Sequence, residues 1–424
     1  MTEPPQDMTG HPAFAALLGA DGVSGLRSGV GRVTFEVARV LTRAPDIADL
    51  ALLVGQTVRP GTFLDLPAVA NPTSGQHDRS PIRALRQVAR GVLPPSAGTQ
   101  LRAAVRAVPG LLALRARYER RRLDHVAADM ARRTGRPVVY HELNMIARPF
   151  SGPTVVTVND LSWLAHPTLH PAERVAWISR GMPRTLRQAT RFIAISNFTA
   201  QEMVRLLGID RARIDVVHPG VSHHFQPRDA AAAAPTLARY GLRDHGYVLA
   251  VSTLEPRKNF DRLLAAHGRL PPAMRQAIPL VIVGGPGWGT TLADAASARA
   301  QCEGRLRLLG HVPDDELVAL YARCAVAIYP SLYEGFGLPV LEPMACAAPV
   351  VTSNTTALPD TAGDAAVLVD PLDVDAIAEA LRHVLDDPAF ADKLRAGGPA
   401  QAARFTWERM AAGMIASWRT ALAA

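Results

Sequence analysis

The sequence predicts an α/β protein built from two Rossmann-like, doubly wound domains that face each other across a cleft. Short apolar runs alternate with amphipathic segments along almost all of the 424 residues, which is the pattern of parallel sheets covered by helices. The stretch QPRDAAAAAPTLARYG, after Phe225, interrupts this alternation before it restarts. The length also suits two domains of roughly 200 residues each.

Apolar runs in the first half predict strands, and the segments VGRVTFEVARVLTR and NFTAQEMVRLLG predict helices between them. The predicted strands are AFAALLG, LALLVG, RPVVYHEL, TVVTVND, RFIAIS and RIDVVHPG. These elements make up a first domain over residues 1–225. Residues 226–245 carry an alanine run and two prolines, so we expect them to connect the two domains.

The restarted alternation predicts a second domain over residues 246–405. Its predicted strands are YVLAVSTL, PLVIVGG, RLRLLG, AVAIYPS, PVVTSN and AAVLVD. Its predicted helices are NFDRLLAAH, DDELVALYARC, a segment from Leu338, and DVDAIAEALRHVL. Open α/β sheets bind ligands at the carboxyl ends of their strands, so functional residues are expected just after these strands.

Basic residues are concentrated in the first domain. Through Phe225 there are 28 Lys and Arg against 17 Asp and Glu, which leaves 18 against 21 of the totals 46 and 38 for the remainder. One interpretation is a set of solvated helix faces. The alternative is attraction to an anionic membrane surface or a lipid-phosphate substrate. Nucleic acid is not expected as a partner, because no binding motif accompanies the arginines.

Cellular location is predicted from three features of the sequence. Cys302, Cys324 and Cys346 fit no disulfide or metal spacing, so buried thiols in a reducing compartment are expected. The N-terminal MTEPPQDMTG lacks the regions of a signal peptide, and no apolar run approaches the roughly 18 residues that cross a bilayer. We therefore expect a cytoplasmic protein, with peripheral contact at the inner face of the plasma membrane suggested by its basic domain.

The run YPSLYEGFGLPVLEPMA predicts a strand, a loop and a helix with Pro339 in its first turn. Glycine lets the backbone approach a ligand closely, and free N–H groups at a helix start suit an anion. The amides of Phe336, Gly337 and Leu338 are therefore expected to hold a phosphate.

Glu334 and Glu342 bracket that loop. A carboxylate that accepts two hydrogen bonds suits a ribose diol, and Glu342, about one turn into the helix, is expected to bind it. Glu334 is then expected to face the sugar end of the same ligand. The alternative is an ordinary strand–helix turn with two surface glutamates.

The segment STLEPRKNFDRLL places Arg257 and Lys258 at the end of a predicted strand. Together they supply two positive charges where a diphosphate would lie. Lysine otherwise occurs only at Lys393, so its use here indicates a need for a compact point charge. Asn259 is predicted to cap the following helix. The alternative is a solvated basic loop.

Polar residues also follow two strong strands of the first domain, namely His141 and Asn144 after one and Asn159 and Asp160 after the next. The same strand-end rule predicts that they face the cleft. Gly31, in SGVGR, would let a loop approach a donor phosphate, although a GxG pair alone is a weak signal. His141 is explained equally well as a structural, buried histidine.

Two further patterns are assigned to structure. IVGGPGWG lacks the third glycine of a dinucleotide loop, because Thr290 stands there, so a dehydrogenase is not expected. The DVD at Asp373 precedes AIAEALRHVL and is predicted to cap a helix rather than to bind a metal. No metal site or cofactor is expected.

Together these segments resemble the GT-B-fold glycosyltransferases of the retaining family 4 group. In the second domain the likeness is carried by LEPRKNFDRLL, LLGHVPDDELVALYARC, YPSLYEGFGLPVLEPMA and PVVTSNTTALPDTAGDAAVLVDP. In the first it is carried by SGVGR, VYHELN, VNDLSWLAHP, IAISNFTAQEM and VVHPGV. It covers most of the chain apart from residues 70–135, and Glu334 and Glu342 match the family's E-x7-E signature.

The resemblance implies a retaining, metal-independent transfer of a hexose from a nucleotide sugar. The catalytic positions that it implies are Arg257, Lys258, Glu334 and Asp160. The donor contacts that it implies are Gly31, His311, Val312, Phe336, Gly337, Leu338 and Glu342. His141, Asn144 and Asn159 remain as acceptor-side candidates. Residues 406–424 would form a helix that packs back on the first domain.

The LEPRKN form resembles bacterial mannosyltransferases that build surface polysaccharides on lipid-linked intermediates. GDP-mannose is therefore the expected donor, with a dTDP- or UDP-sugar as the alternative, and a lipid-linked saccharide or oligosaccharide is the expected acceptor. Asn159 stands where the family commonly has histidine, and asparagine cannot carry that charge. The alternatives are a sugar-nucleotide epimerase of the same fold and an inactive partner subunit that still binds a nucleotide.

Overall fold

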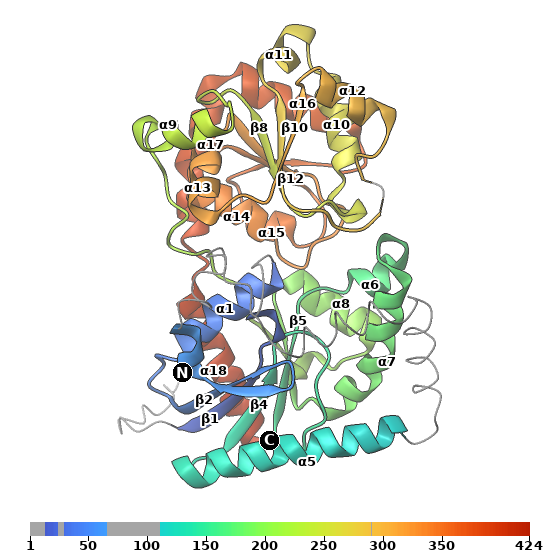
Figure 1. Ribbon diagram of the computed structural model, residues 1–424, viewed down its shortest axis with the longest axis vertical. Coiled ribbons are helices and arrows are strands. Elements are labelled where there is room, and N and C mark those ends of the chain that lie inside the picture. The colour runs from blue at the N-terminus through green and yellow to red at the C-terminus, as the bar shows by residue number, and fades with distance from the viewer. Residues whose placement is uncertain (1–12, 24–28, 66–110, 290) are drawn as a thin grey trace, which may run out of the picture. The chain divides into compact units, whose positions relative to one another are not determined.

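A computed structural model describes residues 13–23, 29–65, 111–289 and 291–424 (Figure 1). Strands and helices alternate along the chain and form two sheets, so the predicted α/β class with two doubly wound sheets is confirmed. The residues group into two compact units. The first is drawn from Met1–Val156, Met182–Arg191 and Trp418–Ala424, and the second from Thr157–Gly181 and Phe192–Ser417.

The first sheet has the strand order β3-β2-β1-β4-β5-β6-β7. Its strands are β1 (Phe14–Gly19), β2 (Ile47–Val54), β3 (Thr57–Pro60), β4 (Val138–Glu142), β5 (Thr154–Val158), β6 (Arg191–Ala194) and β7 (Ile214–Val216). β3 pairs antiparallel with β2 and was not predicted. Its sequence TVRP is largely exposed, so it lacks the apolar pattern of a buried strand, and its proline suits an edge position.

The second sheet has the strand order β10-β9-β8-β11-β12-β13. Its strands are β8 (Val248–Val251), β9 (Leu280–Val283), β10 (Leu306–Gly310), β11 (Val326–Tyr329), β12 (Val350–Ser353) and β13 (Val367–Val369). All of its pairs are parallel. The chain proceeds outward from β8 to β10 and then returns to β11 beside β8. The carboxyl ends of β8 and β11 therefore form the switch point at which such sheets bind ligands.

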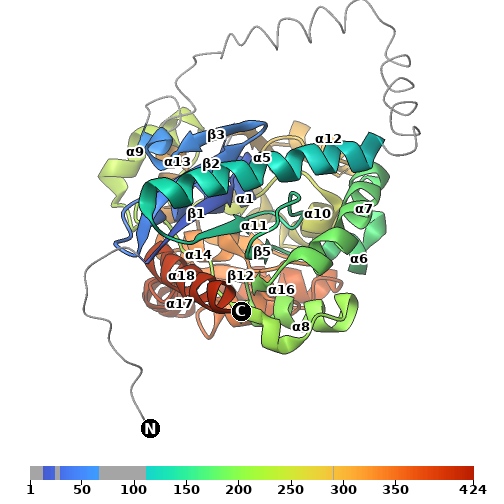
Figure 2. The same ribbon diagram turned by 90° about the horizontal axis from the view of Figure 1, so that it is seen from below.

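Helices connect the strands throughout. In the first half these are α1 (Val30–Leu41), α5 (Leu111–Thr134), α6 (Ser162–Ala165), α7 (Ala172–Gln188) and α8 (Asn197–Leu207). The second half contains α9 (Ala230–Arg239), α10 (Phe260–Gly268), α11 (Pro272–Ala277), α12 (Ala295–Cys302), α13 (Asp314–Ala322), α14 (Leu338–Ala345), α15 (Leu358–Ala362), α16 (Val374–Asp386), α17 (Pro388–Ala402) and α18 (Trp407–Ala423). Helix α5 contacts β1, β2 and β4, and Figure 2 shows it passing over β1 and β2.

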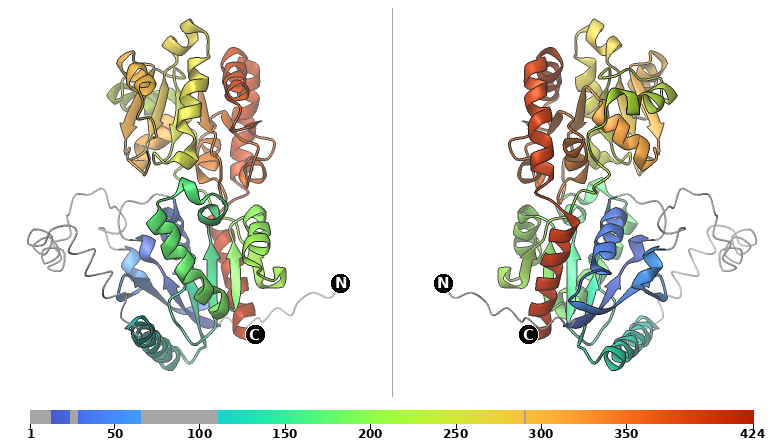
Figure 3. Two further views of the ribbon diagram at one scale, coloured as in Figure 1. Left: turned by 90° about the vertical axis from the view of Figure 1, so that its right-hand side faces the viewer. Right: turned by 90° about the vertical axis from the view of Figure 1, so that its left-hand side faces the viewer.

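Both faces of the second sheet are buried, as a doubly wound sheet requires. Successive residues of β8 illustrate this, because Leu249 belongs to the core under α13 and α14, whereas Val248 and Ala250 belong to the core under α10 and α16. Helices accordingly flank this sheet in Figure 3. With side chains fixed on both faces, the loops at its carboxyl edge start from rigid positions.

One expectation needs correction, and one segment contains an element that was not predicted. Residues 226–245, expected to connect the two domains, contain α9, whose Ala233 and Leu237 are buried in the core of the second unit. The alanine run hid this helix because it carries no apolar periodicity. Burial of the thiols is confirmed for Cys324 and Cys346 but wrong for Cys302, which is exposed. Among the helices of the described ranges, none is long and apolar enough to cross a membrane.

Candidate active site

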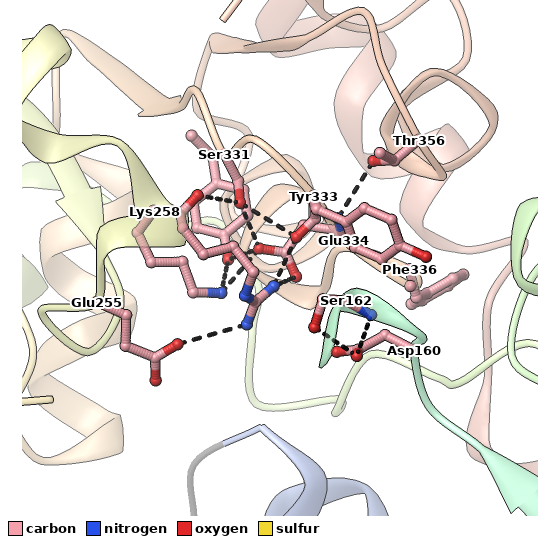
Figure 4. Close-up of polar contacts among 12 residues, drawn as sticks. Asp160, Ser162, Glu255, Lys258, Ser331, Tyr333, Glu334, Phe336 and Thr356 are labelled. Atoms are coloured by element: carbon pink, nitrogen blue, oxygen red, sulfur yellow. Dashed lines mark hydrogen bonds and ion pairs between the residues drawn. The ribbon is translucent and has the colours of Figure 1, made fainter. Parts of the chain in front are cut away.

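The switch point brings together three predicted residues. β8 leads into a short 3-10 turn, Pro256–Lys258, which carries Arg257 and Lys258. β11 leads into the loop that carries Glu334. Because β8 and β11 are neighbours in the sheet, the two loops meet. Figure 4 shows the Lys258 side chain directed at the Glu334 carboxylate, and Arg257 contacts the same carboxylate.

Glu334 is held by four side chains. Its Oε1 atom accepts hydrogen bonds from Lys258 Nζ, Ser331 Oγ and the Tyr329 hydroxyl, each at 2.7 Å. Its Oε2 atom lies 2.8 Å from Nη1 of Arg257. Lys258 also donates to the Tyr329 hydroxyl at 2.6 Å. A carboxylate with this many donors is fixed in position.

The electrostatics of this cluster favour the ionised form of Glu334. Burial alone would raise the pKa of Glu334, but Arg257 and Lys258 outweigh burial and lower the pKa to about 2. Burial and the neighbouring Arg257 lower the pKa of Lys258, while Glu334 opposes them. We therefore describe Glu334 as an ionised carboxylate that compensates buried positive charge.

The Nε–H group of Arg257 has no acceptor among the described residues, although the other guanidinium nitrogens have partners. Its Nη1 atom also donates to the carbonyl of Tyr333 at 2.6 Å, and Nη2 lies 3.6 Å from Glu255 Oε2. Burial would lower the pKa of Arg257, but Glu334 and Asp160 hold it above its usual range. Its Nε atom is buried and has no hydrogen-bond partner within the described part of the chain. A buried donor left unpaired is costly, and an anionic ligand would satisfy it.

Asn259 does not cap the next helix as predicted. It occupies the N-cap position of α10, but its side chain makes no capping bond. Its Nδ2 atom donates instead to the carbonyls of Pro330, at 3.0 Å, and Pro371, at 2.7 Å. The residue has a left-handed φ of 64°, which asparagine tolerates. Asn259 therefore ties the cationic turn to the ends of two other strands.

The glycines of the loop are required by close contacts, as the sequence suggested. A Cβ atom at Gly335 would lie 1.8 Å from the carbonyl oxygen of Asn159. Gly337 has a φ of 122° and precedes α14. Pro339 lies in the first turn of that helix, as predicted. Within the described residues, the N–H groups of Phe336, Gly337 and Leu338 donate to no backbone carbonyl, which suits the predicted phosphate contact.

Both signature glutamates are buried, with 8% of Glu334 and 7% of Glu342 exposed. The alternative of two surface glutamates is therefore wrong. Glu342 lies inside α14 and accepts a hydrogen bond from the Tyr321 hydroxyl at 3.2 Å. The backbone at His311 and Val312 directly follows β10. Val312 is buried in the core and His311 is exposed, so Val312 can contact a ligand only through its backbone.

Asp160 and Asn159 belong to the same unit as Glu334. Oδ1 of Asp160 accepts hydrogen bonds from the backbone N–H of Ser162 at 3.0 Å and from its hydroxyl at 2.7 Å (Figure 4). Asp160 is half-buried, and it is close enough to raise the pKa of Arg257. Asn159 is buried, and its carbonyl oxygen lies against Gly335.

The predicted residues of the first unit do not form a comparable cluster. His141 is fully buried, Trp418 donates to its Nδ1 atom at 3.0 Å, and burial lowers its pKa to about 3. These facts favour the structural interpretation of His141. Asn144 is exposed. Gly31 lies in the first turn of α1, not in a loop, and Gly29 precedes that helix with a φ of 52°.

Sequence reasoning missed a further buried carboxylate, Glu142, at the end of β4. Its Oε2 atom accepts from the Tyr140 hydroxyl at 2.7 Å, and its Oε1 atom accepts from the N–H of Asn144 at 3.2 Å. Burial raises the pKa of Glu142 to about 7. Tyr140 and Glu142 are two residues apart on a strand and so share a face, which is the signal that could have revealed the pair. Tyr329 and Ser331, which both donate to Glu334, were missed as well.

Of the patterns assigned to structure, the helix cap is confirmed, because Oδ1 of Asp373 accepts from the N–H groups of Asp375, at 2.9 Å, and Ala376, at 3.0 Å. Thr290 lies outside the described residues. Within the described residues, no group of three or more His, Cys, Asp or Glu side chains is arranged to hold a metal ion.

Comparison with known proteins covers both halves of the chain. Residues 27–225 match a family model described as Glycosyltransferase Family 4, and residues 240–401 match one described as glycosyl transferases group 1. The O-antigen chain mannosyltransferase B of Escherichia coli is 34% identical over 394 residues, which are 92% of this chain and 96% of that protein.

Two further matches are weaker, one in coverage and the other in sequence identity. The serotype-specific mannosyltransferase WbdA of Escherichia coli is 33% identical over 228 residues, which are 53% of this chain but 28% of that protein. Among solved structures, Anabaena Alr3699/HepE in complex with UDP and glucose matches with a TM-score of 0.64 and 15% identity, over 96% of this chain and 100% of that one. At this identity, the structural match shows a shared fold alone.

Proposed function

The chain belongs to the family 4 glycosyltransferases, and on that premise we propose that it transfers mannose from GDP-mannose to a lipid-linked saccharide, with retention of anomeric configuration. The observation that carries the proposal is the buried cation pair, Arg257 and Lys258, at the switch point of the second sheet. The names of the two mannosyltransferase relatives support the choice of mannose, and that of the O-antigen enzyme supports a role in surface polysaccharide synthesis.

In the proposed reaction the leaving group is a nucleoside diphosphate, whose negative charge increases as the sugar departs. Lys258 and the unpaired Nε of Arg257 would neutralise that charge, and the amides before α14 would bind a phosphate. Glu342 would accept the ribose hydroxyls, while Glu334 and Asp160 would contact the transferred sugar. The departing phosphate would accept the proton of the acceptor hydroxyl, which keeps attack and departure on one face of the sugar.

Helix α5 supports a membrane-associated acceptor. In its first half Leu114 is 64% and Tyr118 68% exposed, and the arginines around them, Arg115, Arg117, Arg120 and Arg121, are exposed as well. Exposed apolar side chains among basic ones suit the surface of an anionic bilayer. We therefore propose that the protein binds peripherally at the inner face of the plasma membrane.

Donor identity is tested by calorimetric titration with GDP-mannose, UDP-glucose and dTDP-rhamnose in turn, in the presence of a chelator. Saturable binding of GDP-mannose that is lost in Glu342→Ala supports the proposal. Glu379→Ala, which removes an exposed glutamate of α16, is the matched control and should bind normally. Binding of another sugar nucleotide in place of GDP-mannose would contradict the donor assignment.

Turnover separates the proposal from its alternatives. Transfer to an undecaprenyl-diphosphate-linked oligosaccharide, with the α-anomer of the donor retained in the product by NMR, is the expected result. GDP-mannose binding without turnover would indicate the inactive partner subunit, and reaction of the donor without acceptor would indicate the epimerase. Sedimentation with vesicles tests the membrane contact: Arg117→Glu/Arg121→Glu should lose binding to anionic vesicles, and binding by that variant would contradict it.

A further inference from the structure

A hydrogen-bonded chain of side chains lies behind Asp160. Ser162 Oγ donates to Asp160 Oδ1 at 2.7 Å, and Nε2 of His170 lies 2.9 Å from the same hydroxyl. Ser162 is 1% exposed and His170 is 9% exposed, so water does not compete for these bonds. The chain is Asp160–Ser162–His170.

The direction of these bonds fixes the state of His170. An ionised carboxylate can only accept, so the single hydroxyl proton of Ser162 is directed at Asp160. Ser162 must then accept from His170, whose Nε2 carries the proton. Nδ1 of His170 is buried and has no partner within the described residues. The imidazole of His170 is therefore bonded through Nε2 to Ser162. Its unpaired Nδ1 atom is destabilising, because a buried polar atom without a partner costs free energy.

The ring of His170 is held in place by the loop GGPGWG, for which the proposed reaction supplies no role. Trp288 Nε1 donates to the carbonyl of Leu169 at 2.8 Å, and its ring lies 5.8 Å from that of His170. The same loop rests on the segment before Arg257, because a Cβ at Gly287 would lie 2.5 Å from the carbonyl oxygen of Leu254. The loop thus links His170 to the segment that carries the cations.

We propose that His170 is a positioning residue that acts through Ser162 to fix the Asp160 carboxylate, with Trp288 holding its ring. The proposal rests on the role of Asp160 in the transfer set out above. One oxygen of Asp160 is occupied by Ser162, so the chain sets the direction in which the other oxygen faces the sugar. Loss of the chain should impair the chemical step more than donor binding, because small displacements of a reacting group are costly.

Other residues of the protein offer matched controls for Ser162 and His170. Ser297 repeats the hydrogen-bond pattern of Ser162, three residues rather than two after its aspartate, because Asp294 Oδ1 accepts from its N–H at 2.8 Å and from its hydroxyl at 2.6 Å. His267 is likewise a buried histidine with one bonded nitrogen, Nε2 at 2.9 Å from the carbonyl of Ile278, and an unpaired Nδ1. Ser297→Ala and His267→Leu therefore reproduce the structural loss away from Asp160.

The kinetic test measures GDP release from GDP-mannose with an undecaprenyl-diphosphate-linked oligosaccharide. Ser162→Ala and His170→Leu should lower kcat by about ten- to a hundredfold while KM for the donor stays unchanged, and the double variant should be no slower than Ser162→Ala alone. His170→Gln, which keeps an N–H donor, should recover much of the rate, and the two controls should turn over normally. A normal kcat in His170→Leu, or additive losses in the double variant, would overturn the proposal.

A second measurement does not depend on the donor. Nitrogen NMR of the ligand-free protein should show His170 as the neutral Nε2–H tautomer, with that signal altered by Ser162→Ala and unaffected by Ser297→Ala. Observation of the Nδ1–H tautomer would overturn the proposed hydrogen-bonded chain, whichever sugar the enzyme transfers. A wild-type protein that shows the expected tautomer but does not turn over GDP-mannose would count against the proposed function and leave the chain in place.

Discussion

Each unit contains a buried glutamate at the carboxyl end of a strand or just beyond it, and the two carboxyl groups differ sharply in their pKa. In the first unit, burial raises the pKa of Glu142 to about 7. In the second, the pKa of Glu334 is lowered to about 2 although its exposure is nearly the same. The amount of burial therefore does not decide the outcome.

The difference lies in where the nearby cations point. Arg148, the cation near Glu142, directs Nη2 at both carboxylate oxygens of Asp21, at 2.7 and 2.8 Å. Glu142 is left with a tyrosine hydroxyl and a backbone N–H. Arg257 and Lys258 both contact Glu334 directly. A direct ion pair offsets the cost of burial, whereas a neutral hydrogen bond offsets it only in part.

The largest effect on activity is expected from removing the positive charge of Lys258. Lys258→Ala should lower kcat by about a hundred- to a thousandfold, because the charge on the departing diphosphate would lose its nearest buried cation. Steady-state GDP release measures this. The matched control is Lys393→Ala, since Lys393 is the other lysine of the chain and is exposed. Turnover of the Lys258→Ala variant close to that of the control would remove Lys258 from the catalytic site.

Neutralising Glu334 should affect stability. Its pKa of about 2 lies below the ordinary 4.5, so the carboxylate stabilises the fold above pH 4.5, and that stabilisation is lost as the pH falls toward 2. Glu334→Gln should therefore cost about 3 kcal/mol at pH 7 and progressively less in acid, measured by urea unfolding. Glu379→Gln breaks an exposed ion pair with Arg382 and should change stability by less than about 1 kcal/mol. Equal losses in both variants would contradict this account.

Neutralising Glu142 should change stability in the opposite direction from neutralising Glu334, and by a smaller amount. The native carboxyl keeps its proton up to about pH 7, whereas the unfolded one loses it near pH 4.5, so Glu142 costs stability increasingly between those values and fully above pH 7. Glu142→Gln lacks that cost. It should be about 2 kcal/mol more stable than the wild type at pH 8 and no more stable at pH 4. A stability difference that does not vary with pH would show that Glu142 is ionised in the native protein.

The sequence was sufficient to predict the strands and helices that have a strong apolar pattern, and the candidate site residues that follow the strands. Every predicted strand is present. The sequence placed Lys258 and Glu334 after two of these strands, but the pairing of β8 with β11, which brings the two side chains together, is known only from the structure. The edge strand β3 and the helix α9 were missed because neither has an apolar period. Local patterns cannot reveal such elements when tertiary contacts supply their stability.

The partners of individual side chains were harder to predict. Asn259 has the residue type of a helix cap, but its Nδ2 atom donates to two carbonyls that follow other strands, and its Oδ1 atom accepts from Arg262 instead of from a backbone N–H. His170 and Ser162 are eight residues apart and belong to no recognised motif, so their bond appears only when the turn between them is known. The sequence thus predicted the positions that carry charge better than the contacts that orient them.

The ion pair between Lys258 and Glu334 also has a consequence for synthesis on the ribosome. The two residues are 76 positions apart, and the bond from Asn259 to Pro371 spans 112. A nascent chain therefore exposes Lys258 well before Glu334 has been translated, and burying Lys258 in that interval would leave it without this ion pair. The carboxyl edge of the second sheet must stay hydrated until most of the domain has emerged, which makes it a late-forming part of this protein.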